Sequence, residues 1–205
     1  MKRFLRVSIA SLLLAMSALA FAGEAAVEVV RSTTDQVLAR VKTDKEALRA
    51  DPGKMYNLVA ELIFPHFDFD IMSQWVLGDS WGGADAASRG AFQEQFRKLL
   101  VRTYATALLE FSDQTITYPD IEQPTQPHTA AVRQEINQEG ADVLPVLYRL
   151  HDKTGEWKVF DVSVDGVSLI KTYRASFAAA IKNDGLPALI KNLEAKNQQY
   201  AAQAQ

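Results

Sequence analysis

The sequence predicts an α+β fold in which helices pack on a curved, four-stranded antiparallel sheet. Three observations predict it. Apolar residues recur at helical spacing in the first half of the chain and again near its end. Between these parts, four segments alternate apolar and polar residues, as half-buried strands do. Short connections join the four segments, which favours an antiparallel meander.

The first 22 residues have the pattern of a signal peptide. Three basic residues lie among the first six, and an apolar run over residues 7–22 ends in Ala20-Phe21-Ala22. A membrane-spanning helix needs about 20 apolar residues, so this run is short for a permanent anchor. We therefore expect residues 1–22 to be a cleaved signal peptide and residues 23–205 to be one exported domain. An uncleaved anchor is the alternative.

The composition excludes several classes of protein. The 205 residues include 22 Lys and Arg, 25 Asp and Glu, and no Cys. Without Cys there is no disulfide framework, thiolate nucleophile, Cys-ligated zinc or iron–sulfur cluster. The net charge of −3 becomes −6 when the three basic residues of the leader are removed, which argues against a protein that coats nucleic acid. At 48% apolar residues, the chain has the composition of a folded domain.

The first helical part divides at residues that break helices. Apolar spacing over residues 24–50 predicts one or two amphipathic helices, which end at Asp51-Pro52-Gly53. A short helix follows over residues 55–63, and Gly82-Gly83 marks a loop. The clearest helix spans residues 85–111, where large apolar side chains recur at steps of three and four.

The strands and the final helices follow. We expect strands at residues 114–122, 129–138, 142–150 and 156–164, with a hairpin turn at residues 152–155. Ser168 can then cap a helix that ends at Asn183-Asp184-Gly185. Pro187 lies in the first turn of a last helix. The polar tail, residues 198–205, is expected to fray.

The acidic and histidine residues offer weak signals for chemistry. Asp68 and Asp70, with His66 nearby, could ligate a cation, but no calcium loop follows and no second ligand group appears. The simpler interpretation is that the two Asp residues cap a helix or face water. His66, His128 and His151 are dispersed and share no metal-binding spacing, so we expect surface or capping roles. We predict no metal site.

No motif for a catalytic nucleophile occurs, and we expect no enzymatic activity and no cofactor. Lys171, Arg174, Lys182 and Lys191 give the last part of the chain a mildly basic surface. Such residues usually form a solvated helix face. Contact with an acidic partner or a lipid head group is the alternative.

Two blocks of the sequence resemble a known family. The first runs from Phe67-Asp68-Phe69-Asp70-Ile71-Met72 through Leu77-Gly78 and Trp81 to the helix around Phe92–Ala105. The second comprises Pro145-Val146-Leu147-Tyr148, Trp157–Val162, Gly166–Leu169, Tyr173-Arg174 and Phe177. Together the blocks resemble the periplasmic phospholipid-binding components of the Mla lipid-transport system, also called the toluene-tolerance family. The resemblance covers nearly all of residues 23–205.

The resemblance implies a periplasmic carrier that holds a phospholipid as cargo in an apolar cavity between sheet and helices. It also implies two partners, an outer-membrane lipoprotein–porin complex and an inner-membrane ABC transporter complex, and a role in outer-membrane lipid asymmetry. An exported interaction module or chaperone without lipid is one alternative. A hydrolase with an unrecognised site is the other.

Periodicity, and not the resemblance, selects the candidate lipid-binding residues. They are the expected inward positions of the sheet and of two helices: Phe96, Leu100, Tyr104, Leu108, Val132, Ile136, Val146, Tyr148, Phe160, Val162, Val164, Leu169, Tyr173 and Phe177.

Overall fold

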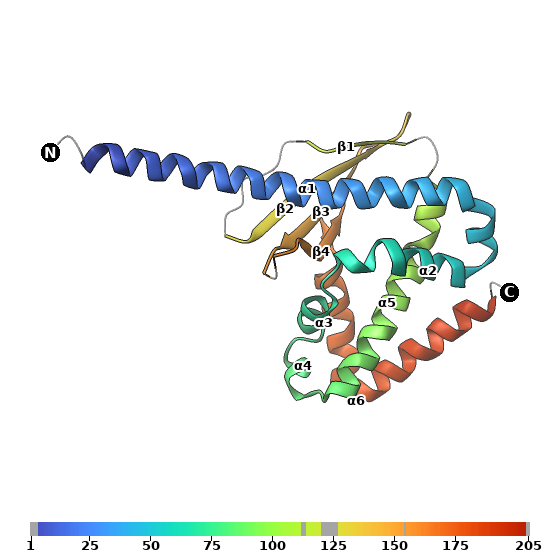
Figure 1. Ribbon diagram of the computed structural model, residues 1–205. Coiled ribbons are helices and arrows are strands. Elements are labelled where there is room, and N and C mark those ends of the chain that lie inside the picture. Colours follow the sequence, from blue (N-terminus) through green and yellow to red (C-terminus); the bar gives the residue numbers. More distant parts are fainter. Residues whose placement is uncertain (1–3, 112–113, 120–126, 154, 204–205) are drawn as a thin grey trace.

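The chain passes through a helical part, a sheet and a second helical part, in the predicted order. The computed structural model describes residues 4–111, 114–119, 127–153 and 155–203, with side chains within residues 23–202 of these ranges (Figure 1). The first helices are α1 (Phe4–Ala50), α2 (Pro52–Leu62), the 3-10 turn η1 (Phe64–His66), α3 (Phe69–Leu77), α4 (Asp79–Gly83) and α5 (Ala86–Leu109). The strands are β1 (Thr115–Thr117), β2 (Thr129–Asn137), β3 (Leu144–His151), β4 (Lys158–Val164) and β5 (Val167–Ser168), and α6 (Leu169–Gln203) follows.

Aspartate side chains cap the N-termini of two helices, α2 and α5. Asp51 accepts hydrogen bonds from the backbone N–H groups of Gly53 and Lys54, and Pro52 occupies the first position of α2. Asp85 accepts from the N–H of Ser88 at 2.7 Å and so caps α5. The helix predicted over residues 85–111 is therefore confirmed, and it is slightly shorter, at Ala86–Leu109. In α1 a single non-helical residue, Asp44, marks a kink.

The sheet is an antiparallel meander with the strand order β1-β2-β3-β4-β5. The four predicted strands are present, but the prediction of four strands is short by one. The fifth, β5, is a two-residue strand that pairs Val167 with Val164 after a tight turn, and periodicity is not visible over two residues. A β-bulge between Arg149 and Leu150 shifts the register between β3 and β4. Residues 120–122 and Thr154, part of the expected strand and turn, lie outside the described residues.

Two further expectations need correction or refinement. Gly82 and Gly83 are not a loop, since they are the last residues of α4. The two final helices are present, but they form one bent element, α6, with its break at Gly185. The backbone angles there, φ 82° and ψ 165°, are accessible almost only to glycine.

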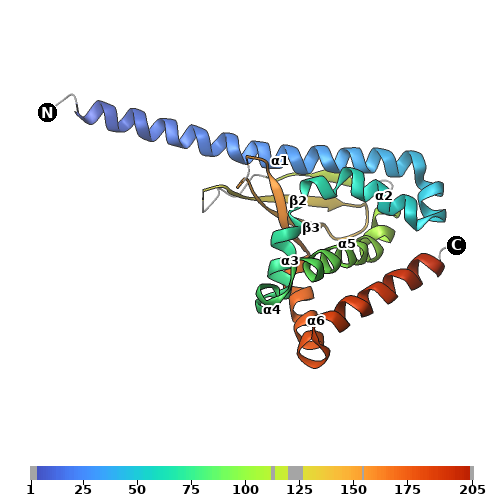
Figure 2. The same ribbon diagram turned by 60° about the horizontal axis from the view of Figure 1, so that its bottom comes forward.

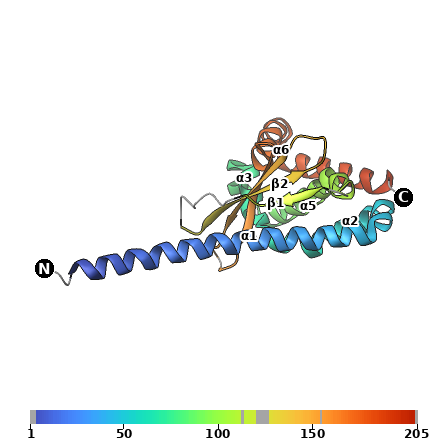
Figure 3. The same cartoon turned by 90° about the horizontal axis from the view of Figure 1, so that it is seen from above.

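The long helix α1 lies across one face of the sheet, and its N-terminal part extends beyond the rest of the molecule (Figures 1 and 3). The helices α3, α5 and α6 form a second group on the other side. The bend in α6 turns its second half back toward α5 (Figure 2). No helix in the described part of the chain is both long and apolar enough to cross a membrane.

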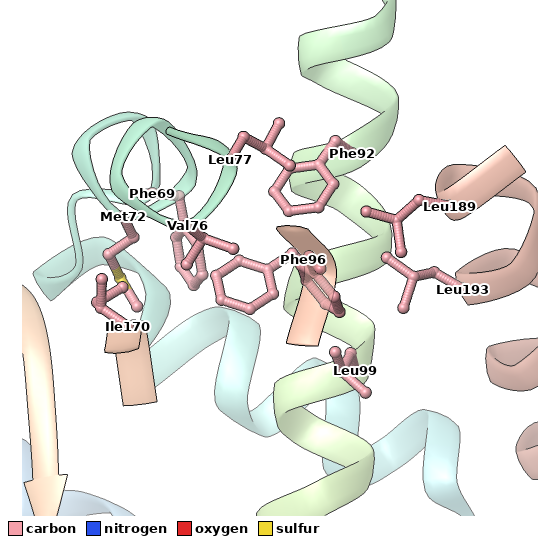
Figure 4. Close-up of a cluster of buried hydrophobic side chains, with 11 residues drawn as sticks. Phe69, Met72, Val76, Leu77, Phe92, Phe96, Leu99, Ile170, Leu189 and Leu193 are labelled. Carbon is pink, nitrogen blue, oxygen red and sulfur yellow. The ribbon is translucent and has the colours of Figure 1, made fainter. Parts of the chain in front are cut away.

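The buried side chains form three clusters. One joins α3, α5 and both halves of α6, and Figure 4 shows Phe92 and Phe96 of α5 between α3 and the side chains of Leu189 and Leu193. A second joins the sheet to the part of α1 around residues 26–30. The third joins α1, α2 and α5. The apolar face of α1 is thus shared between the sheet and the helices.

Candidate functional site

One face of the sheet carries a continuous array of apolar side chains. Directly paired residues of an antiparallel sheet point to the same face. The register therefore aligns four rows across the strands on that face: Ile116–Ile136–Leu144, Gln134–Val146–Val164–Val167, Val132–Tyr148–Val162 and Ala130–Leu150–Val159. Eleven of these thirteen side chains are Val, Ile, Leu or Tyr, so the face is suited to contact with hydrocarbon.

Helix α1 covers this face. Ala26, Val27 and Val30 are 0%, 9% and 4% exposed, and they belong to the same buried cluster as the strand residues. The spacing of apolar residues over 24–50 predicted that these positions lie on a buried stripe. It gave no sign of which surface the stripe contacts, because periodicity defines a face of a helix and not its partner.

A polar network interrupts the apolar face. Gln134 is 2% exposed, and its amide nitrogen donates to the hydroxyls of Tyr118 at 3.0 Å and of Thr34 at 3.2 Å. The Tyr148 hydroxyl donates to the amide oxygen of Gln134 at 3.0 Å. Burial, and then the neighbouring Tyr118, raise the pKa of Tyr148, so its hydroxyl stays a neutral donor. The guanidinium of Arg31 lies 5.1 Å from the centre of the Tyr118 ring.

Seven of the fourteen candidate residues come together at this face. Val132, Val146 and Val162 are buried in its centre, and four others pack against them. Those four are Ile136, Tyr148, Val164 and Leu169.

Five candidates from the helices lie in a different group, between α5 and α6. Phe96, Tyr173 and Phe177 form an aromatic group with ring-centre distances of 5.4 to 6.3 Å, and Leu100 packs at its edge. Tyr104 is hydrogen-bonded to Tyr173, and burial together with this neighbour raises the pKa of Tyr104 to about 12. These rings fill space between α5 and α6.

The last two candidates are separate from both groups. Leu108 packs against the cluster formed by α1, α2 and α5. Phe160 lies at the bulge and contacts Trp75 edge-on, with ring centres 5.1 Å apart. A single cavity that unites the sheet and helix residues stays a prediction.

Sequence reasoning missed several members of the apolar face. Leu150 and Val159 are 0% and 2% exposed, and Phe67 packs against the same cluster. Leu150 was expected on a strand, but a bulge shifts its partner, and bulges leave no clear signal in the hydropathy pattern. Gln134 was overlooked because a lone polar residue in a strand ordinarily faces water.

Of the acidic pair, Asp68 caps a helix and contacts a buried histidine. Asp68 accepts from the N–H of Ile71 at 2.9 Å and so caps α3, as the simpler interpretation predicted. Its other oxygen lies 2.9 Å from Nε2 of His151. His151 is only 3% exposed, so the prediction of a surface or capping role is wrong for it. Nδ1 of His151 accepts from the N–H of Lys153, which leaves the proton on Nε2 to be donated to Asp68.

Neither remaining histidine has such a partner set. His66 is half-buried, and burial, then Lys158, lower its pKa. His128 is exposed and pairs with Asp152 at 2.6 Å. Within the described part of the chain, no group of three or more His, Cys, Asp or Glu residues could hold a metal ion.

A separate cleft of about 320 Å³ lies between α2, α5 and the second half of α6. Its walls include Tyr56, Lys98, Arg102, Glu194 and Asn197. The walls are mixed in charge and lie away from the sheet, so this cleft contains none of the fourteen candidates.

Comparison with known proteins gives one answer for most of the chain. The sequence profile of the MlaC protein family matches residues 31–195. The chain belongs to the MlaC family. This match contains all fourteen candidate residues and begins just after Val30, so the three apolar α1 residues on the sheet face precede it.

Two curated relatives of this MlaC-family chain support the assignment. The toluene tolerance protein ttg2D of Pseudomonas putida is 31% identical over 182 residues, which are 88% of this chain and 84% of that protein. The intermembrane phospholipid transport system binding protein MlaC of Haemophilus influenzae is 24% identical over 170 residues, which are 81% of this chain and 79% of that protein.

A solved structure shares the fold. The phospholipid-binding protein from Ralstonia solanacearum, determined in complex with a phospholipid, superposes with a TM-score of 0.79 at 32% identity. The superposition covers 86% of this MlaC-family chain and 98% of that protein. The α+β architecture with an antiparallel sheet is therefore common to both.

Proposed function

We propose that this chain is an exported carrier that binds a phospholipid and moves it through the periplasm. The observation that carries the proposal is the apolar sheet face, in a chain that shares its fold with a protein solved with a phospholipid bound. Membership of the MlaC family supports the same function, because a relative at 24% identity is named as a phospholipid-transport binding protein.

The energetics of acyl chains explain why a carrier is needed. Each buried methylene contributes about 0.8 kcal/mol, so two chains of roughly 16 carbons resist transfer to water by about 25 kcal/mol. A protein face built of Val, Ile, Leu and Tyr side chains replaces most of that contact. The free energy of moving a phospholipid between a bilayer and such a face is then close to zero. The carrier itself therefore requires no nucleotide, cofactor or catalytic residue.

The acyl chains bind at the sheet face under this proposal. Its lining includes Val132, Val146, Val162, Val164 and Leu169, and the helix candidates extend it toward α5 and α6. Ala26, Val27 and Val30 of α1 lie on this face in the structure. Lipid and this segment of α1 therefore compete for the same surface. The proposed head-group end is at the solvent-facing edge, since the centre offers only the Gln134 network.

The proposed partners follow from the family and from the leader. Residues 1–22 act as a cleaved signal peptide. The carrier then exchanges lipid with an outer-membrane lipoprotein–porin complex and an inner-membrane ABC transporter complex, which maintains outer-membrane lipid asymmetry. Its net charge of −6 without the leader opposes direct adsorption to an anionic bilayer.

The deciding experiment is to purify the processed protein without detergent, extract it with solvent and measure bound lipid by mass spectrometry. We expect about one phospholipid per chain. A second arm offers the delipidated protein vesicles that contain a fluorescent phospholipid and measures uptake. If the folded protein contains no lipid and takes up none, the carrier proposal is wrong, and an interaction module or chaperone becomes the better explanation.

A further inference from the structure

A second cleft, which shares no lining residue with the sheet face, carries unpaired positive charge. It has a volume of about 240 Å³ and lies between the junction of α3 with α4 and the first half of α6. Arg174 and Lys182 line one wall. With Lys171 they are spaced by three and eight residues, so the three cations lie along one stripe of α6. All three are exposed.

Within the described residues, none of these cations forms an ion pair. Asp79 also lines the cleft but makes no ion pair with either wall residue. The chain without its leader has six more negative than positive charges. Three neighbouring cations without a carboxylate partner are therefore a local exception to the charge of the molecule.

The Arg174 side chain packs against Gly78. A Cβ atom at Gly78 would lie 3.2 Å from one terminal nitrogen of Arg174, 3.4 Å from Cζ and 3.6 Å from Nε. The guanidinium group therefore lies flat over the glycine. Gly78 also has φ +55° and ψ −129°, a conformation that disfavours any side chain. The backbone angles favour glycine at this position, and the missing Cβ lets the guanidinium of Arg174 approach the backbone closely.

A guanidinium matches the two oxygens of a carboxylate, because its N–H groups form a planar fork. Arg174 is exposed, however, and exposed ion pairs contribute little in water. A free small anion would bind weakly here. The pair becomes stronger when a large partner covers the cleft and excludes water.

We propose that this cleft is a docking site for an acidic segment of a partner protein, with an Asp or Glu carboxylate on Arg174 and a second acidic group near Lys182. The surface is separate from the sheet face, so this assignment goes beyond lipid binding. A protein partner is favoured over an anionic membrane because the net negative charge of the chain repels a bilayer surface.

The test follows the side-chain Nε–H signal of Arg174 and the amide signal of Gly78 by ¹⁵N NMR. Three probes are added to the processed protein: an acetylated Leu-Glu-Glu-Leu-Glu peptide, inorganic phosphate and phosphatidylglycerol vesicles. We expect the peptide to shift both signals, with phosphate weaker and vesicles without effect. If the vesicles bind through Arg174, or if the peptide shifts neither signal, the proposal is wrong.

Variants separate geometry from charge. Arg174→Gln should weaken peptide binding about tenfold, since a hydrogen bond to a charged group is lost. Arg174→Lys should recover only part of it because the planar fork is absent. Lys191→Gln, on the second half of α6, is the matched control and should leave binding unchanged. An equal loss in Lys191→Gln would reduce the effect to general helix charge and overturn the site.

The lipid content of Arg174→Gln distinguishes this inference from the carrier proposal. We expect the same amount of phospholipid as in the unmodified protein. A fall in bound lipid would assign Arg174 to the lipid site and overturn a separate docking surface. A protein that holds no lipid but binds the peptide would contradict the carrier proposal alone.

Discussion

The hydroxyl of Ser168 donates a 2.8 Å hydrogen bond to a carboxylate oxygen of Asp161, and both side chains are buried where β4 meets α6. The same carboxylate accepts from the N–H of Ile170 at 3.3 Å and lies 3.3 Å from a guanidinium nitrogen of Arg149. Ser168 also caps α6, since its oxygen accepts from the N–H of Lys171. One carboxylate thus fixes the angle at which α6 leaves the sheet.

Asp161→Asn should destabilise the fold. The amide cannot accept all three hydrogen bonds, and it removes the charge opposite Arg149, so we expect a loss of about 2–3 kcal/mol in the free energy of unfolding. Urea denaturation followed by circular dichroism measures it. Asp142→Asn, at an exposed position, is the control and should stay within about 0.5 kcal/mol. Equal stability of the two variants would contradict the role given to Asp161.

Two histidine–aspartate pairs among the described residues provide a matched comparison. The His151–Asp68 pair is buried on the histidine side, whereas 71% of the His128 side chain is exposed. Asp68→Asn removes the acceptor of a buried imidazole and should cost about 1–3 kcal/mol in unfolding free energy. Asp152→Asn should change stability by less than about 0.5 kcal/mol. The prediction is wrong if thermal melts of the two variants coincide.

Substitution of alanine at two glycines should change the free energy of unfolding in opposite directions. Gly185→Ala forces a side chain into the strained backbone at the bend of α6 and should cost roughly 1–3 kcal/mol. Gly90 lies exposed inside α5, where an added Cβ meets nothing within 4 Å. Gly90→Ala should therefore stabilise the protein by about 0.5–1 kcal/mol. Chemical denaturation of both variants measures the two changes. A Gly185→Ala protein as stable as the unmodified protein would contradict the requirement for glycine at the bend.

Tyr104 should ionise at a higher pH than an ordinary tyrosine. Its pKa is raised from 10.0 to about 12, whereas the unfolded chain ionises near the ordinary value. The stabilisation from neutral Tyr104 is therefore complete below pH 10 and declines as the pH rises from 10 through 12. An absorbance titration of tyrosinate should show a late-ionising group that Tyr104→Phe removes. If the variant titrates like the unmodified protein, Tyr104 is not that group.

A carboxylate on the sheet face should affect lipid more than folding. Val162→Asp or Val146→Asp should lower co-purified phospholipid strongly, because an acyl chain cannot cover a charge without stripping its water. Val101→Asp is the control, since Val101 is as buried as Val162, at 9% against 8%, but lies in the third cluster. Mass spectrometry and urea denaturation measure the two effects. Equal losses of lipid and stability would reassign the valine to the packed core.

The sequence was sufficient for the elements and insufficient for their contacts. The stripes on residues 85–111 and the alternation in β2 to β4 each reflect a local period, so helix, strands and meander followed from them. The bulge at Phe160, the strand β5 and the burial of His151 depend on register and on distant partners such as Asp68. Hydropathy does not encode these relationships.

The candidate site was predicted in part for the same reason. Val132, Val146 and Val162 come together because side chains alternate between the two faces of a sheet, and these three lie on the same face. Phe96 and Phe177 were expected beside them, yet they contact each other between α5 and α6, because an apolar helix stripe does not specify whether sheet or helix covers it. The contribution of Val27 and Val30 required knowledge of where α1 lies.

The bend at Gly185 also bears on when the molecule can become compact. Leu189 and Leu193 complete the cluster around Phe92 and Phe96, so this cluster stays open to water until the second half of α6 has been synthesised. A nascent chain that lacks its last segment should remain loose. Under the export proposed above, this delay keeps the chain loose while it passes through a translocation channel.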